Sequence, residues 1–348
     1  MKTEKDPQPS PRKWENPAPA SQAGQDQPVS PELIEKLKAL EEKYAAMGQD
    51  MPSYLDGLLY ADYLTYWDYI HLDTLLSLQN PKTAFPDELI FVTYHQFTEL
   101  YFKLILSEIK QIAEHEALTP PFFTERVKRI NRYFEILVHS FDVMTEGMDR
   151  EQFLKYRMSL LPASGFQSAQ YRMIEICATK FRNLVDRENR HQLPSDATFA
   201  ELYEFLYWKQ GATELATRQK TLTLKQFEKK YADSLIQLAT EYEFKNLWMR
   251  YRKITQEQGE HPELFHALRR FDALVNVNWP LAHYKSAVRY LHRDPQVIEA
   301  TGGTNWQKYL PPRFQKRMFY PEMWSEEEKE NWGKGWVEEV LRENNPGG

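Results

Sequence analysis

The chain has 348 residues and a net charge of −6, and 42% of its residues are apolar. The acidic balance argues against a nucleic-acid partner, because no excess of lysine and arginine is available to neutralise phosphates. The single cysteine, Cys177, excludes a disulfide framework and a cysteine-based zinc site. No run approaches the roughly 20 apolar residues of a membrane span, and the N-terminus has no apolar segment typical of a secretory signal. We therefore expect no membrane partner and a cytoplasmic location.

The N-terminal residues 1–30 are rich in Pro, Gln, Ser and Ala, a composition that predicts a disordered tail. Ser30-Pro31-Glu32 predicts the start of a helix, because serine caps, proline suits the first position and an acidic residue favours the first turn. We expect residues 31–348 to form one domain.

The rest of the chain shows helical spacing. Within residues 86–115, apolar side chains recur every three or four positions, as on one face of a helix. They are Tyr94, Phe97, Tyr101, Leu104, Ile105, Ile109 and Ile112. The same spacing predicts helices in 123–148, 166–186, 197–210, 222–254 and 262–292. Because alternating strand patterns are scarce, the predicted fold is all-α. We expect 187–240 to be an insertion or excursion from the core, and the Trp-rich C-terminal stretch to pack back on it.

Common catalytic motifs are missing from the sequence. None of the nine histidines lies in an H-E-x-x-H frame. E-x-x-H occurs at Glu263–His266 within a predicted helix and at Glu188–His191 outside the predicted helices, whereas a dinuclear carboxylate bundle would need it on two helices. There is no Gly-rich phosphate loop of either common type and no G-x-S-x-G nucleophile elbow.

Two histidines lie within apolar helical segments. His95 is in FVTYHQFTELYFK with Phe91 one turn earlier, and His283 is in NVNWPLAHYKSAVRYL with the small Ala287 one turn later. Either histidine could ligate a haem iron. A lone histidine on an apolar helix is, however, more often an ordinary core residue.

Two loops could contact a ligand. Arg157 precedes LLPASGFQSAQYR, where Ser164 is the predicted N-cap of a helix starting near Gly165 or Phe166, and an arginine beside a helix N-terminus suits a carboxylate. A capped turn with a surface arginine would have the same pattern. Thr301-Gly302-Gly303 lets the backbone approach a ligand, as a plain flexible loop also would.

These features occur together and in this order in one family. FVTYHQFTELYFKLI, YRMSLLPASGFQSAQYR, LAHYKSAVRYL and ATGGT resemble signature segments of tryptophan 2,3-dioxygenases, and LTYWDYIHLDTLL resembles the entry segment of that family. The resemblance covers residues from about 60 to about 305. It implies a haem-binding helical bundle that uses haem b and O2 to open the indole ring of L-tryptophan, giving N-formyl-L-kynurenine, the first step of tryptophan catabolism.

The resemblance also implies a role for individual residues. His283 would be the axial ligand of the haem iron, and His95 would be the distal histidine that meets the indole N–H. Arg157 would pair with the substrate carboxylate, and Thr301 with Gly302 would close over the ammonium group and a haem propionate. Phe91, Phe153 and Leu160 would form apolar walls, and Ser164 would lie near the haem edge. Tyr66, Tyr69 and Ile70 would reach into a neighbouring subunit's pocket in a homotetramer.

The last signature segment departs from the family pattern. His283 and Thr301 are eighteen positions apart, more than is usual in the family, and Thr304-Asn305-Trp306 follows the glycines. Both departures fall on the loop expected to cover the substrate. A haem-dependent hydroxylase acting on tyrosine or another aromatic amino acid is therefore an alternative, and a haem-binding protein without catalysis is another.

Overall fold

The computed structural model describes residues 29–59, 64–160, 165–212, 219–293, 296–297 and 312–334. The predicted all-α fold is confirmed, because almost every element in these ranges is a helix. The β structure of the described residues is limited to one antiparallel pair, β1 (His292–Arg293) with β2 (Gln296–Val297), and a single bridge between Val185 and Leu206.

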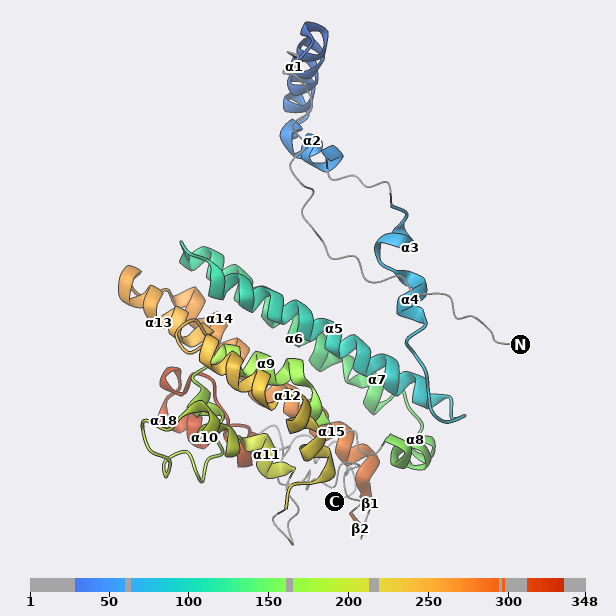
Figure 1. The fold of residues 1–348 in the computed structure, drawn as a ribbon, viewed down its shortest axis with the longest axis vertical. Coiled ribbons are helices and arrows are strands. Elements are labelled where there is room, and N and C mark those ends of the chain that lie inside the picture. The colour runs from blue at the N-terminus through green and yellow to red at the C-terminus, as the bar shows by residue number, and fades with distance from the viewer. Residues whose placement is uncertain are drawn as a thin grey trace, which may run out of the picture. The chain divides into compact units, whose positions relative to one another are not determined.

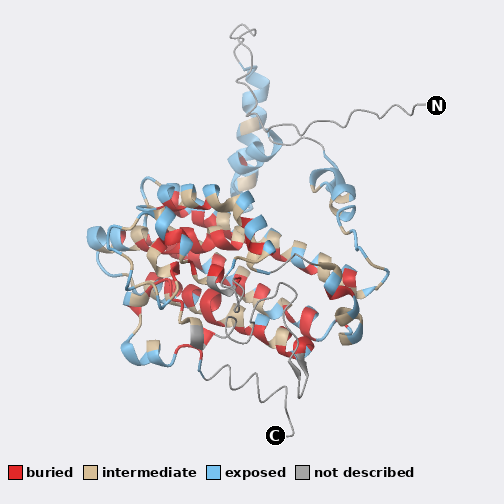
Figure 2. Ribbon diagram, turned by 60° about the horizontal axis from the view of Figure 1, so that its bottom comes forward, coloured by how far each residue is buried: buried red, intermediate tan, exposed pale blue. Residues whose placement is uncertain are grey.

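The chain divides into two compact units, one ending at Leu76 and the other beginning at Ser77. The first unit contains α1 (Pro31–Ala46), α2 (Met51–Leu59), α3 (Tyr66–Tyr69) and α4 (Leu72–Leu76). The predicted start of α1 is confirmed, since the Ser30 hydroxyl accepts a hydrogen bond from the Leu33 amide at 3.3 Å. Met51 is the only buried residue of these four helices, as the pale blue of this unit in Figure 2 shows.

The second unit is a bundle of helices with long α5 and α6 lying side by side (Figure 1). Its helices are α5 (Asp87–Glu114), α6 (Pro120–Ser140), α7 (Asp142–Thr145), α8 (Arg150–Tyr156), α9 (Ala169–Ala178), α10 (Phe199–Glu204), α11 (Tyr207–Gly211), α12 (Leu222–Glu241), α13 (Leu247–Gln258), α14 (Pro262–Ala273), α15 (Trp279–Leu291), α17 (Pro312–Gln315) and α18 (Glu326–Glu330). Short 3₁₀ turns are η1 (Arg157–Leu160), η2 (Gly165–Gln167), η3 (Phe181–Leu184) and η5 (Pro321–Met323), and η4 (Leu274–Asn278) is a π turn.

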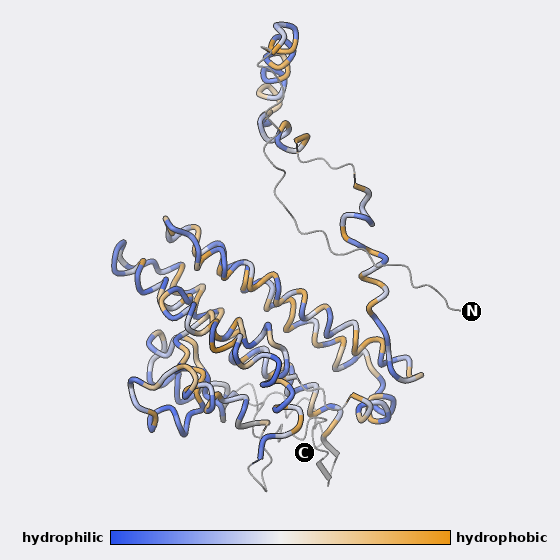
Figure 3. Tube along the Cα trace, in the orientation of Figure 1, coloured by the Kyte–Doolittle hydropathy of each residue, from blue (hydrophilic) through white to orange (hydrophobic). Residues whose placement is uncertain are grey.

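The core of this unit forms where the apolar stripes of α5, α6, α9 and α14 meet. Orange and blue alternate along these helices in Figure 3, and the apolar side chains are those buried in Figure 2. The segment 187–240, expected to be an excursion, contributes to the same apolar cluster through Leu202, Tyr203, Leu224, Phe227 and Leu235. None of the helices in the described ranges combines the length and apolar character needed to cross a bilayer.

Helix ends depart from the predictions where side chains cap the backbone. The predicted helix 222–254 is divided because Asn246 accepts from the Met249 amide at 3.0 Å and starts α13. The helix predicted to begin near Gly165 with Ser164 as its cap begins at Ala169 instead, because the Ser168 hydroxyl accepts from the Tyr171 amide at 3.2 Å. Gly165 lies in the 3₁₀ turn η2 that precedes it.

The C-terminal stretch packs on the bundle over its described residues, 312–334, as predicted. Its buried apolar side chains include Met318, Phe319, Tyr320, Met323 and Trp332. Phe319, Tyr320 and Met323 join the main apolar cluster, while Met318 and Trp332 join a second cluster beside α15. The aromatic residues of this stretch therefore complete the bundle.

Candidate active site

His95 lies in the N-terminal half of α5 with its ring packed against the preceding turn. The ring is tilted over Phe91 with the ring centroids 4.1 Å apart, and Nδ1 lies 2.7 Å from the Phe91 carbonyl oxygen. A carbonyl can only accept, so Nδ1 must carry the proton. Burial lowers the pKa of His95, although the Phe91 carbonyl and Glu99 oppose the shift. The neutral ring therefore leaves Nε2 as a hydrogen-bond acceptor.

His283 lies on α15 and also stays neutral. Burial, with a smaller contribution from His95, lowers its pKa to about 4. Its ring is stacked with that of Phe141, with the centroids 5.9 Å apart. Phe141 in turn lies 5.6 Å from Tyr94, the residue before His95. These aromatic contacts connect the two histidines across the bundle.

Both imidazoles lie within the second unit beside its second apolar cluster. Each is partly exposed to solvent, and His95 is close enough to His283 to contribute to the lowering of its pKa. Two aromatic residues of the cluster contact the rings, Tyr94 at 5.8 Å from His95 and Phe141 at 5.9 Å from His283 between centroids.

Gly165 brings the η2 turn against the histidine on α15. A methyl group added at Gly165 would lie 3.4 Å from Cε1 of His283, in van der Waals contact with the ring. The next residue, Phe166, is stacked on Trp208 of α11 at 6.0 Å and contacts Phe227 of α12 edge-on at 6.0 Å. The turn beside His283 is thus supported by the segment 187–240.

The helix α8 and turn η1 supply a second wall. The ring of Phe153 lies 6.4 Å from Phe91, and the ring of Tyr156 lies 6.2 Å from Phe91. Arg157 follows directly and is only 5% exposed, so it is not the surface arginine of an ordinary capped turn. Burial lowers its pKa, but a guanidinium remains cationic at neutral pH. Leu160 ends the same 3₁₀ turn and is half-buried.

The structure therefore brings together His95, Phe91, Phe153, Arg157 and His283 within one unit. Ser164, Thr301 and Gly302 lie outside the described residues. Tyr66 and Tyr69 bound helix α3 of the first unit and are 69% and 71% exposed, and Ile70 follows them.

Three residues beside the histidines or beside Phe91 were missed by sequence reasoning. They are Phe141, Tyr156 and Gly165. Gly165 stands within the P-A-S-G-F segment and could have been singled out as a point of close approach. The two aromatic residues carry no signal that separates them from other core positions.

The donor set suits a haem better than a bare metal ion. Among the described residues, no group of three or more His, Cys, Asp or Glu side chains could hold a metal ion. A haem iron needs as few as one protein ligand, and apolar surroundings suit its macrocycle. His283 is neutral, lies beside an apolar cluster and has Gly165 as a close neighbour, which fits that need.

Comparison with known proteins points to one family. The sequence model of the tryptophan 2,3-dioxygenases matches residues 58–268, a range that contains His95 and Arg157 and ends before His283. The chain is 26% identical over 277 residues to the tryptophan 2,3-dioxygenase of Pseudomonas fluorescens, covering 77% of this chain and 92% of that protein. It is 42% identical over 119 residues to that of Ruegeria sp., covering 33% of this chain and 42% of that protein. The alignment thus spans less than half of the Ruegeria relative but nearly all of the Pseudomonas one.

Proposed function

The chain belongs to the tryptophan 2,3-dioxygenase family, and from this membership we propose that it inserts O2 across the C2–C3 bond of the indole of L-tryptophan to give N-formyl-L-kynurenine. The comparisons support an oxidoreductase with this activity, and none of them favours a hydroxylase. The observation that carries the proposal is the pair of neutral histidines, His95 and His283, which lie beside one apolar cluster and close enough for His95 to contribute to the lowered pKa of His283.

The cofactor of this proposal is haem b, held by His283. Ferrous haem binds O2 and supplies the redox chemistry when it is present. The neutral imidazole of His283 offers a free nitrogen lone pair at pH 7, because its pKa is about 4. Gly165 lets the backbone approach this ring, and we assign Ser164 and Gly302 to the edge of the cofactor by family resemblance.

His95 and Arg157 bind the substrate at its two polar ends. With Nδ1 donating to the Phe91 carbonyl, Nε2 of His95 is left to accept the indole N–H. Arg157 offers two parallel charge-assisted hydrogen bonds to the carboxylate, in surroundings that are shielded from water. Thr301 is assigned to the ammonium group by resemblance.

Apolar side chains beside His95 orient the indole ring and exclude water. Phe91 and Phe153 present apolar faces from α5 and α8, with their centroids 6.4 Å apart, and Leu160 follows on η1. Holding substrate and O2 in a dry, fixed arrangement lowers the entropic part of the barrier.

The proposed assembly is a cytoplasmic homotetramer in which the first unit reaches a neighbour. Large apolar side chains stay exposed on this unit, among them Leu58, Tyr66, Trp67 and Tyr69. An exposed apolar patch of this kind is typical of a protein interface. Tyr66, Tyr69 and Ile70 would then line the neighbour's substrate pocket.

Two measurements test the proposal. Reduced, haem-loaded protein is given L-tryptophan or L-tyrosine in air, and the products are identified by mass spectrometry. Ring-opened product from tryptophan alone is the expected result, whereas a hydroxylated amino acid would establish the alternative. His283→Ala should lose the Soret band during purification while circular dichroism stays helical, and His95→Ala should keep its haem.

A further inference from the structure

The helix that carries His283 is interrupted just before it. Helices α14 and α15 form one continuous run, and the π turn Leu274–Asn278 joins them. A π turn contains one more residue than an α-helical turn, is rare, and is frequently found at functional sites. Since each residue of an α-helix turns the chain by about 100°, the extra residue decides which way every later side chain points. The direction of His283 therefore depends on this turn.

A buried aspartate ties the turn to the C-terminal stretch. Asp272 is fully buried, and its carboxylate accepts hydrogen bonds from the Phe319 and Tyr320 amides at 2.8 and 3.0 Å. It also accepts from the Trp324 indole N–H at 2.9 Å and from the Asn276 side-chain amide at 2.6 Å. Asn276 lies inside the π turn, so one carboxylate connects the turn to residues more than forty positions later.

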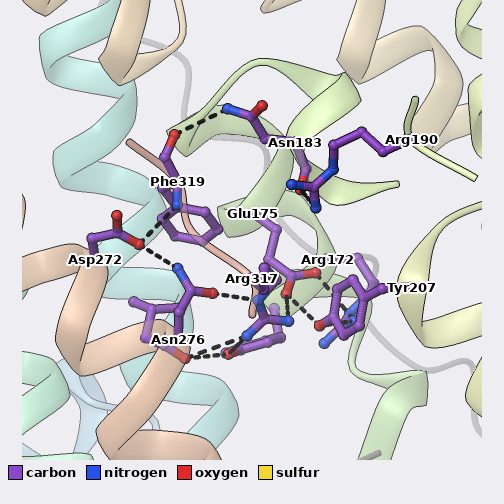
Figure 4. Close-up of polar contacts among 11 residues, drawn as sticks. Arg172, Glu175, Asn183, Arg190, Tyr207, Asp272, Asn276, Arg317 and Phe319 are labelled. Atoms are coloured by element: carbon purple, nitrogen blue, oxygen red, sulfur yellow. Dashed lines mark hydrogen bonds and ion pairs between the residues drawn. The ribbon is translucent and has the colours of Figure 1, made fainter. Parts of the chain in front are cut away.

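A buried arginine, Arg317, also forms hydrogen bonds with the π turn. Arg317 donates through Nε to the side-chain oxygen of Asn276, and through Nη2 to the Val275 carbonyl at 3.4 Å and the Tyr171 hydroxyl at 3.2 Å. Its Nη1 pairs with Glu175 of α9 at 2.6 Å. Two of the five residues of the π turn, Val275 and Asn276, are thus bound by one guanidinium. Figure 4 shows Arg317 beside Asn276 and Glu175.

The network is more elaborate than stability alone requires. Glu175 is also paired with Arg172 at 3.1 Å and accepts from the Tyr207 hydroxyl at 2.6 Å. Burying four charged side chains, Arg172, Glu175, Asp272 and Arg317, is costly, and apolar residues of similar volume are often at least as stabilising. What apolar packing cannot provide is directional bonds to Val275 and Asn276. These bonds lie on the turn that sets the direction of His283, which indicates a role beyond stability.

We propose that Arg317 and Asp272 are positioning residues that hold the π turn and thereby aim His283 at the haem. This inference rests on the proposed function, in which His283 is the haem ligand. The C-terminal stretch then belongs to the cofactor site although it does not contact the cofactor. Loosening the turn should weaken the bond between His283 and the iron before it unfolds the bundle.

The test uses haem-loaded, full-length protein and the variants Arg317→Lys and Asn276→Ala. Lysine keeps the charge but cannot reproduce the planar fork of donors, and alanine removes the shared partner of Arg317 and Asp272. Haem dissociation into excess apomyoglobin and the Soret position are measured at a temperature where circular dichroism matches wild type. We expect dissociation at least tenfold faster and a shifted Soret band in both variants.

The matched control replaces an arginine that forms an ion pair with a buried glutamate elsewhere in the bundle. Arg126 pairs with the buried Glu108 at 3.2 Å and contacts neither the π turn nor the C-terminal stretch through any described bond. Arg126→Lys should lower the melting temperature without changing haem dissociation or the Soret band.

The outcomes separate the two proposals. If Arg317→Lys and Asn276→Ala melt earlier but release haem at the wild-type rate with an unchanged spectrum, the network is only a stabilising brace and the inference is wrong. If Arg317→Lys does not fold, Trp324→Phe, which removes one donor to Asp272, decides by the same readouts. Wild-type protein that binds no haem, or His283→Ala that retains it unchanged, would contradict the proposed function instead.

Discussion

Replacing Arg157 with alanine tests the substrate clamp. Arg157 is 5% exposed and follows Tyr156, whose ring lies 6.2 Å from Phe91. A carboxylate bound there would exchange water for charge-assisted hydrogen bonds worth roughly 1.5–3 kcal/mol each. Because about 1.4 kcal/mol corresponds to tenfold in rate, loss of even one such bond predicts a fall in kcat/KM for L-tryptophan of at least about tenfold.

The assay compares two substrates so that general damage can be recognised. L-Tryptophan carries the carboxylate, and tryptamine is the same molecule without it. Wild-type protein should favour L-tryptophan strongly, and Arg157→Ala should lose most of that preference. Arg157→Lys should recover little of it, because a point charge cannot replace two parallel bonds.

The refuting result is specific. If Arg157→Ala slows both substrates by the same factor, the arginine supports the structure of the η1 turn and does not bind the carboxylate. Circular dichroism and haem content of the variant, measured alongside, ensure that a folded and loaded protein is being compared.

Three further predictions concern His95 and the first unit. His95→Ala should lower kcat/KM for L-tryptophan several-fold, because it removes a neutral hydrogen bond worth about 0.5–1.5 kcal/mol. The same variant should leave kcat/KM for 1-methyltryptophan, which has no indole N–H, unchanged. An equal loss on both substrates would contradict the assignment. Burial lowers the pKa of His95, and only the neutral ring accepts the indole N–H. The kcat/KM for L-tryptophan should therefore stay level as the pH falls through about 6.5, the ordinary histidine pKa, and should decline only at lower pH. A decline centred near that ordinary value would show that the pKa of His95 is not lowered. Light scattering should give a tetramer, and co-expressed Tyr66→Ala and Arg157→Ala subunits should regain activity that neither has alone, whereas a fully active monomer would rule out the exchanged arrangement.

The helices could be predicted from the sequence because most of them bury one apolar stripe. The spacing of 86–115 predicts α5 within one residue at each end, and Ser30-Pro31 marks the start of α1. Local capping limited the accuracy elsewhere. Ser164 and Ser168 both precede apolar positions, and only the backbone path shows that Ser168 provides the cap of α9.

The candidate site could be predicted only through the family resemblance. His95 and His283 are far apart in sequence, and periodicity alone gives no reason to bring their helices together. The comparisons confirm the family prediction. The roles of His95, Arg157 and His283 stay predictions, and so does the tetramer.

The π turn before α15 was beyond the reach of sequence reasoning. The segment 262–292 predicts a single helix, and its apolar spacing contains nothing that marks an extra residue in one turn. The turn is held by contacts from Asp272 and Arg317 to residues distant in sequence. Such a feature arises from tertiary hydrogen bonds, which a local pattern does not encode.

The fate of molecular oxygen tests the central claim most directly. Reduced, haem-loaded protein is mixed with L-tryptophan under ¹⁸O2, and the product is weighed by mass spectrometry, with His283→Ala as the control. Our account predicts N-formyl-L-kynurenine carrying both atoms of one O2 molecule, and no product from the variant. A product that is hydroxylated and carries a single labelled atom, or turnover that survives in His283→Ala, would contradict it.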